Sequence, residues 1–296
     1  MLNVSEAGAS DGAPRRGWTQ SLAHSLGELG GWRPSVSTKL GATFTEMRGS
    51  VMSMDDMGGV LRPSDRDREL VETPHLAIAI ELASPQVKIG GIETRLFAAA
   101  EVMPSFAIER NLAAEEDPSG PTPPPNATLG FLESAISGRG SRTTATVAPL
   151  MYGFAFGAEL QGSIADIDFW VRPSARWLRY EVDVRGKVIE AQKPNPIGTD
   201  FRTIALNAHG SLYMSGIGPA VEVEFDAGEV GPFRARAFVE AGAYRILGDR
   251  DLNLYDSVSI DDAIGMDRFE ARWSMEADPW LYRVGIGVRV SIPEAR

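Results

Sequence analysis

The segment from Trp280 to Ile292 alternates between large, mostly apolar residues and polar or small residues. Because successive side chains of a β-strand point to opposite faces of its sheet, this alternation predicts a strand with one apolar face. The opposite face carries mainly arginine, glycine and serine. A soluble sheet exposes such a polar face to water, whereas a transmembrane β-barrel turns it inward and places the apolar face in lipid.

The same two-residue period recurs along most of the chain and predicts an all-β protein of about eight strands. The clearest example begins at His75, where Leu76, Ile78, Ile80 and Leu82 share one face. We expect a break in phase at the Gly216–Pro219 kink, where the alternation changes sides. The predicted strands are residues 32–47, 75–87, 94–110, 144–160, 166–189, 201–225, 233–247 and 268–292.

The connections between these strands alternate in length. Those at residues 88–93, 161–165 and 227–231 are tight, whereas residues 48–74, 111–143, 193–200 and 248–267 form long polar connections that we expect to be solvated loops. Short turns on one side and long loops on the other are typical of an outer-membrane barrel with both termini on its inner side. The predicted fold is a closed antiparallel up-and-down transmembrane β-barrel spanning residues 32–296.

The last strand carries a polar-x-Gly-x-x-apolar-x-apolar motif, formed by Arg283, Gly285, Val288 and Val290. With the loop rhythm, this motif makes residues 32–292 resemble the small outer-membrane β-barrels of Gram-negative bacteria, the group typified by outer-membrane proteins A and X. In that family the motif is an insertion signal, with aromatic residues usual at the apolar positions and often a terminal phenylalanine. This chain has valines there and continues to Arg296.

The resemblance implies an integral outer-membrane protein of the cell envelope with a structural or surface-interaction role, passing small solutes at most. It also implies a monomeric protein that is not an enzyme and needs no cofactor. Its partners would be outer-membrane lipid, lipopolysaccharide and, during insertion, the barrel-assembly machinery.

Charged residues of both signs occupy the predicted inner face of strand after strand. An eight-stranded barrel is just wide enough to be filled by side chains, so we expect these charges to pair and to close the lumen. Removing one partner of a buried pair costs about 3–5 kcal/mol. The alternative is a soluble sheet with these charges exposed. The predicted inward residues are Arg95, Glu101, Glu159, Arg172, Arg176, His209, Glu222, Glu224, Arg234, Arg236, Glu240, Arg283 and Arg289.

The N-terminal region, residues 1–31, is predicted to be a partly disordered periplasmic segment with a short amphipathic helix. Trp18, Leu22, Leu26 and Leu29 recur at helical spacing and precede a glycine pair. A helix packed on one end of the barrel is the favoured interpretation, with a membrane-surface anchor as the alternative. Met1–Pro14 contains no basic segment followed by an apolar one, so no secretory signal is expected there.

Composition excludes other classes. The 296 residues carry a net charge of −11, which argues against nucleic-acid binding, and they include no cysteine for disulfides or thiolate metal sites. Asp249, Asp251 and Asn253 resemble the start of a calcium loop, but Leu254 replaces the required glycine, so no metal site is expected.

Two other functions stay open at this point. A soluble lipocalin-like barrel would bind an apolar ligand and would need an apolar lumen. The pair His209 and Ser211 lies on one strand face about 7 Å apart and resembles the His-x-Ser pair of outer-membrane lipid A deacylases, with Glu222 or Glu224 as the acid. Leu212 stands where that family usually has asparagine. The pair is also predicted to face the lumen, where it could not act on lipid.

Overall fold

A computed structural model describes residues 31–55, 60–106, 109–115, 140–147, 150–165, 167–191, 203–262 and 265–292. Over these ranges the chain forms a twelve-stranded antiparallel sheet, as the predicted all-β antiparallel class requires. The same ranges contain no helix suited to crossing a membrane. The helix predicted in residues 18–29 lies outside them.

The strands are β1 (Arg33–Asp55), β2 (Val60–Ala83), β3 (Val87–Ile89), β4 (Ile92–Pro104), β5 (Glu109–Glu115), β6 (Gly140–Val147), β7 (Leu150–Ile164), β8 (Ile167–Ala191), β9 (Thr203–Val230), β10 (Phe233–Leu247), β11 (Asp251–Asp262) and β12 (Gly265–Ser291).

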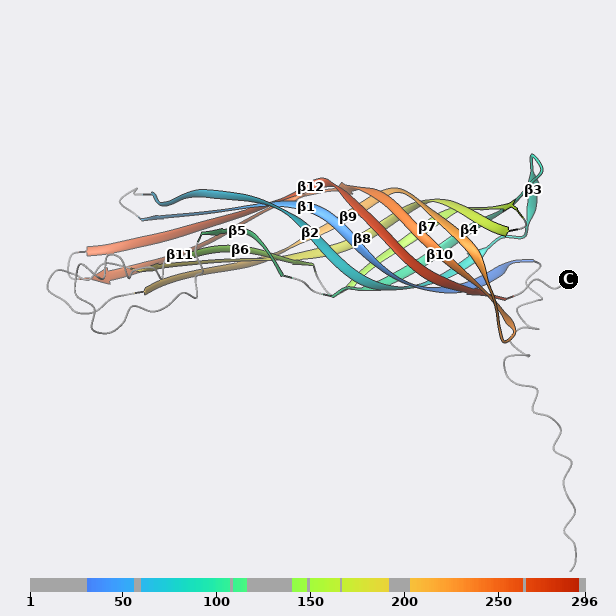
Figure 1. The fold of residues 1–296 in the computed structure, drawn as a ribbon. Coiled ribbons are helices and arrows are strands. Elements are labelled where there is room, and N and C mark those ends of the chain that lie inside the picture. Colours follow the sequence, from blue (N-terminus) through green and yellow to red (C-terminus); the bar gives the residue numbers. More distant parts are fainter. Residues whose placement is uncertain are drawn as a thin grey trace, which may run out of the picture.

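Eight of these strands close into a ring in the order β1, β2, β4, β7, β8, β9, β10, β12. Each pairs with the ring strands before and after it in the sequence, and β12 returns to pair with β1, so that Leu40 lies opposite Ile286. Figure 1 shows these strands winding obliquely around a common axis. Each of the eight segments predicted from the alternation overlaps one ring strand, although residues 144–160 also take in the end of β6 and residues 94–110 the start of β5.

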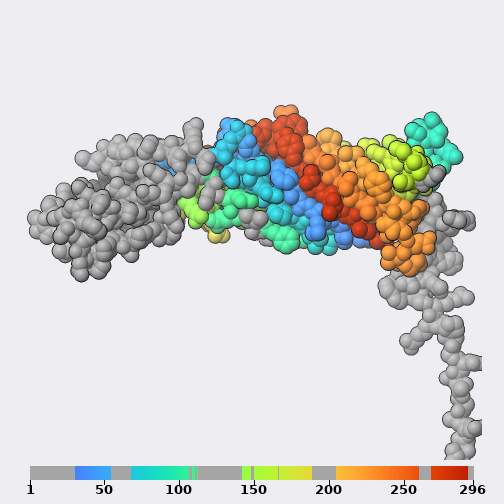
Figure 2. Space-filling view, viewed as in Figure 1, coloured from blue at the N-terminus to red at the C-terminus, as the bar shows by residue number. Residues whose placement is uncertain are grey.

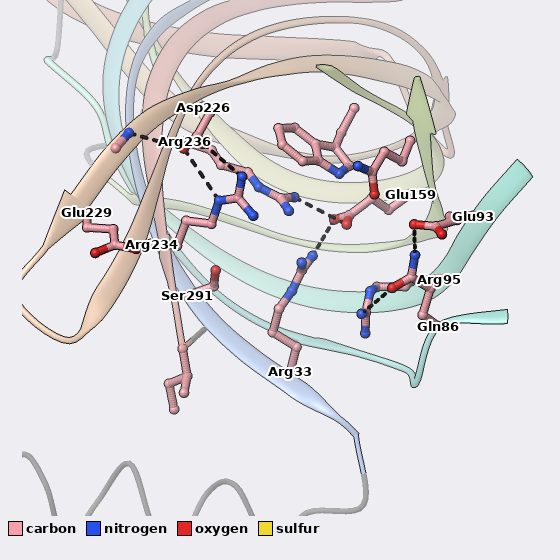
Figure 3. Close-up of a pocket in the computed structure, with 14 residues that line it drawn as sticks. Arg33, Gln86, Glu93, Arg95, Glu159, Asp226, Glu229, Arg234, Arg236 and Ser291 are labelled. Carbon is pink, nitrogen blue, oxygen red and sulfur yellow. Dashed lines mark hydrogen bonds and ion pairs between the residues drawn. The ribbon is translucent and has the colours of Figure 1, made fainter. Parts of the chain in front are cut away.

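One end of the ring, here named the turn end, holds the short connections. Gly90, Gly91 and Gly231 adopt positive φ angles of 60°, 87° and 61°. Glycine enters this left-handed region without the steric penalty of a Cβ atom, which suits it to tight turns. Arg33 and Ser291, the first residue of β1 and the last of β12, also lie at this end, beside the pocket in Figure 3.

The opposite end, here named the extension, corrects the prediction of long solvated loops. Much of residues 48–74 and 248–267 is strand: β1 and β2 continue as a paired hairpin, and β11 pairs with β12. The extension comprises residues 47–55, 60–71, 109–115, 140–147, 180–191, 203–214, 251–262 and 265–277. In it β11, β12, β1 and β2 form one set of paired strands, and β5, β6, β8 and β9 form another.

The two faces of the ring strands differ in polarity as the alternation predicts. On β12, Ile286 is 63% exposed, whereas Arg283 and Arg289 are buried in the interior. On β1, Leu40 is 59% exposed and Lys39 is buried. Figure 2 shows the outer surface of β2, β1, β12, β10 and β9 side by side across one face of the molecule. Apolar residues therefore face outward and charged residues face inward in this part of the structure.

The predicted break in phase at Gly216–Pro219 is wrong. The pairing of β8 with β9 runs in one register from Phe169 opposite Phe225 to Ala191 opposite Thr203. What changes along β9 is the polarity of its faces: Glu222 and Glu224 are buried in the ring, and Leu206 and Leu212 are buried on the same side in the extension.

Candidate functional site

The ring interior holds an ion-pair cluster near its junction with the extension. The guanidinium of Arg283 lies 2.7 Å from a carboxylate oxygen of Glu101 and 2.7 Å from one of Glu240. Lys39 Nζ lies 2.8 Å from Glu101 and 2.7 Å from Glu240. Arg176 also contacts Glu240, at 2.7 Å. Three cations thus share two carboxylates, all of them buried.

A second cluster lies toward the turn end and centres on Arg172, which is fully buried. Its guanidinium lies 2.6 Å from Glu81, 2.9 Å from Glu224 and 3.3 Å from Glu222. It also stacks over the Phe97 ring, 4.0 Å from the centroid. Further ion pairs join Arg289 to Glu81, Glu222 and Glu224, Arg236 to Glu159 and Glu224, and Arg33 to Glu159.

Arg176 connects the two clusters, because it pairs with Glu222 as well as with Glu240. The result is a continuous buried ion-pair network through the ring. A cavity of about 20 Å³ remains among its side chains, bordered by Lys39, Glu101 and Arg176. That volume holds about one water molecule, so these side chains fill the middle of the ring.

Inward glycines leave the space that these long side chains occupy. A Cβ atom added at Gly287 would lie 2.6 Å from the Phe238 ring and 2.7 Å from Lys39 Cβ. At Gly41, it would lie 2.6 Å from the carbonyl oxygen of Val284. A larger residue at either position would displace its neighbours.

The structure brings together most of the inward residues named from the sequence, with three exceptions: Arg95, Arg234 and His209, the last of which is exposed. Arg95 is buried near the turn end, where it donates hydrogen bonds to the Ser84 carbonyl and the Gln86 side chain. Arg234 is partly exposed and pairs with Asp226 at 2.8 Å. The network members Glu101, Glu159, Arg172, Arg176, Glu222, Glu224, Arg236, Glu240, Arg283 and Arg289 lie together.

Sequence reasoning missed three members of the network: Arg33, Lys39 and Glu81. The signal for Glu81 was present, because it alternates with the apolar face of Leu76 to Leu82. Lys39 likewise precedes the outward Leu40. Of the motif residues, Arg283 and Gly285 belong to the inner face of β12, and Val288 is exposed on the outer face.

A pocket of about 820 Å³ opens at the turn end. In Figure 3, Arg33 and Arg236 converge on Glu159 at its base, and Arg234 pairs with Asp226 at its rim. The hydrogen bond from Arg234 lowers the pKa of the Asp226 carboxyl below its usual value. The labelled arginines therefore already have partners within the protein.

His209 and Ser211, the pair considered for hydrolysis, lie outside the ring. The expected interior position of His209 is wrong, because its side chain is exposed on the outer face of the extension. Ser211 Oγ donates a hydrogen bond of 2.6 Å to Asp183 Oδ1. The Ser211 hydroxyl is therefore coupled to a carboxylate of β8 and not to the imidazole.

No protein-family model and no curated protein matches this chain. Among solved structures it is similar to a major outer membrane protein of Thermus thermophilus, at 10% identity and a TM-score of 0.31 over 85% of this chain and 99% of that one. It is also similar to the attachment invasion locus protein Ail of Yersinia pestis, at 6% identity and a TM-score of 0.24 over 86% and 97% of the two chains.

A third similar structure is the outer membrane protease OmpT of Escherichia coli, at 10% identity and a TM-score of 0.26 over 88% of this chain and 97% of that one. The three matches are outer-membrane proteins, the group that the sequence pattern resembles. At these TM-scores the matches carry no argument about function. The narrower likeness to outer-membrane proteins A and X stays a prediction.

The expectation that the chain is not an enzyme is withdrawn, because outer-membrane proteins include enzymes such as the protease OmpT. A fold alone does not determine whether a chain is catalytic, since catalysis depends on the residues of a particular site.

Proposed function

We propose that this chain is an integral outer-membrane β-barrel whose eight-stranded ring spans the membrane. The supporting observation is an inversion of polarity along continuous strands. On β12, the outward Val284 and Ile286 are apolar and the inward Arg283 is charged, whereas farther along the same strand Trp273 is buried and Arg272 is exposed.

The same inversion occurs on β1, β8 and β9. A strand that passes from lipid into water should invert in this way, because lipid favours an apolar exterior and water favours a polar one. Exposed apolar residues surround the ring in numbers that soluble monomers rarely show. They include Val36, Leu40, Ile78, Ile80, Leu82, Leu96, Val102, Phe154, Phe156, Ile217, Val221, Phe225, Val239, Val284, Ile286 and Val288.

The proposed role is structural or surface-interacting, with outer-membrane lipid around the ring and the extension in water. A lipocalin-like function finds no support, because the middle of the ring is filled by paired charges and the pocket at the turn end is lined mainly by charged and polar residues. A filled interior of paired charges should not conduct ions. We therefore expect little steady conductance from the purified protein in planar bilayers, and a stable ohmic current would contradict a closed lumen.

The membrane position is tested by placing an arginine on each side of the proposed boundary. Ile286→Arg puts a charge on the outer face of the ring and should lower the free energy of unfolding by about 2–4 kcal/mol near the bilayer midplane. Asn253→Arg, on the exposed face of β11, should change it by less than about 0.5 kcal/mol. Urea titration in phosphatidylcholine vesicles measures both values.

Equal stability of the two variants in vesicles would reject the proposed membrane face. So would recovery of the wild-type protein as a monodisperse monomer in buffer without detergent, because the exposed apolar surface of the ring requires lipid or detergent.

A further inference from the structure

Four basic side chains gather on the outer face of the extension, on the neighbouring strands β6, β8 and β9. Lys187 lies opposite Arg142 of β6, and Arg185 lies opposite His209 of β9. They border a shallow hollow of about 320 Å³. The basic patch is defined as Arg142, Arg185, Lys187 and His209.

The acidic residues of the described chain balance this patch only in part. Within the described part of the chain, Arg185, Lys187 and His209 have no ion pair, and the acidic residue that borders the hollow, Glu109, lies 3.9 Å from Arg142. Like charges side by side on adjacent strands are unfavourable. Their clustering is unexpected in a chain with a net charge of −11. An anion from outside the protein would offset this repulsion.

The arrangement favours a ligand with several anionic groups. Residues opposite each other on adjacent strands are about 5 Å apart, and alternate residues of one strand are about 7 Å apart. We propose that the basic patch binds a sulfated or phosphorylated polysaccharide, whose repeated anionic groups reach several of these cations at once. The exposed side chain of Asn207 beside the patch adds an amide for hydrogen bonds to sugar hydroxyls.

Nucleic acid is the less favoured polyanion. Single strands are bound by aromatic platforms on which bases stack, and the residues bordering the hollow include no Phe, Tyr or Trp. A charge-repeating saccharide needs no such platform.

The position of the patch indicates a ligand from the aqueous side, a step that depends on the proposed membrane function. Trp177 lies beside the outward Ile217 of the ring, and Arg185 follows eight residues later on the same strand, about 26 Å away along it. The outward residues between them are Arg179, Glu181 and Asp183. The two acidic residues lie nearest the patch and would repel lipid phosphates, whereas a soluble polysaccharide reaches the patch without passing them.

The test measures binding of labelled dextran sulfate to the full chain in an uncharged detergent, which requires no membrane position. The double variant Arg185→Gln/Lys187→Gln should weaken binding more than tenfold. The matched control Arg268→Gln/Arg272→Gln removes two arginines from the other sheet of the extension, where both pair with Glu270, and should change affinity less than twofold. Glu109→Gln should strengthen binding.

Wild-type binding that weakens with added salt and is absent for uncharged dextran supports the proposal. Equal losses in the two double variants, with unchanged circular dichroism, would overturn it, as would no binding by the wild type. If single-stranded DNA of equal charge binds as tightly as dextran sulfate, the assignment of the ligand as a polysaccharide is overturned. If reconstitution into lipopolysaccharide vesicles prevents the binding of dextran sulfate, the inference that the ligand comes from the aqueous side is overturned. If Ile286→Arg fails to destabilise the protein in vesicles, the proposed membrane position fails, but the binding measured in detergent still stands. The membrane proposal and the binding proposal can therefore be tested separately.

Discussion

The ring and the extension are built from the same strands but have opposite interiors. In the ring, the inward residues of β8 include Arg172 and Arg176, which are paired with carboxylates. In the extension, the inward residues of the same strand include Val182, Val184 and Val188, which are packed among apolar side chains. The phase of the strand is unchanged between the two regions.

The proposed membrane position accounts for this difference through the surroundings of each region. An extension in water would have to bury apolar side chains to gain hydrophobic stabilisation of about 25 cal/mol per Å². A ring in lipid would place its apolar side chains outside and would have little hydrophobic gain to obtain from its interior. Its interior must therefore satisfy charges through pairing, which makes it sensitive to the loss of any one partner.

The largest expected effect comes from breaking the charged interior. Arg283→Met removes the cation that pairs with both Glu101 and Glu240 and should lower the free energy of unfolding by about 3–5 kcal/mol. Arg272→Met is the matched control on β12, because its side chain is 59% exposed, and it should cost less than about 0.5 kcal/mol. Urea titration in vesicles measures the loss in the free energy of unfolding for both variants. Similar losses in the two variants would mean that the ring interior is not distinct from the surface.

A smaller effect is expected from overfilling the apolar interior. A Cβ atom at Gly186 would overlap the Trp273 ring, whereas one at Gly210 would meet only the end of the Leu254 side chain. Gly186→Ala should therefore cost about 1–3 kcal/mol, and Gly210→Ala should cost less. Urea titration in vesicles measures the free energy of unfolding of both variants.

The energetic coupling between Gly186 and Trp273 tests this second prediction more strictly. Trp273→Phe should restore part of the stability of Gly186→Ala, because the smaller ring makes room for the methyl group. A double-mutant cycle measures the interaction. Additive losses would show that Gly186 and Trp273 do not share the packing that the structure gives them.

The ring strands could be predicted from sequence because the two-residue period sets their faces and the apolar face is unmistakable. Ile286 and Arg289 show this directly, since alternation alone places them outside and inside. The actual ion pairs could not be predicted, because they join strands far apart in sequence, as with Lys39 and Glu240. The alternation orders residues along a strand and contains no information about partners across the interior.

The extension departs from the prediction for a physical reason. Taking the polar face as inward is correct in the ring but fails in the extension, where the polar face is outward; this is why the alternation predicts an interior His209 and a break in phase on β9. Segments such as residues 48–74 resemble loops in sequence because their outward residues are polar. Their inward residues, among them Val51 and Val71, carry the strand signal.

The smallest effect is expected at the turn end, where an ion pair is exposed. Asp226 and Arg234 lie 2.8 Å apart, with side chains 41% and 39% exposed. The hydrogen bond from Arg234 lowers the pKa of Asp226, so the pair stabilises the fold fully above the unfolded-state pKa of about 3.9. This stabilisation is lost as the pH falls through the lowered folded-state pKa. Asp226→Asn should cost about 0.2–1 kcal/mol at pH 7.

Urea midpoints of the wild type and Asp226→Asn, compared at pH 7 and at pH 2 to 3, measure this contribution. The two proteins should converge at the lower pH, where the wild-type carboxyl is protonated. High salt should also narrow their difference at pH 7, because exposed charges are screened, and should leave most of the loss in Arg283→Met. If Asp226→Asn cost as much as Arg283→Met at pH 7, burial would not be what makes the ring's ion pairs indispensable.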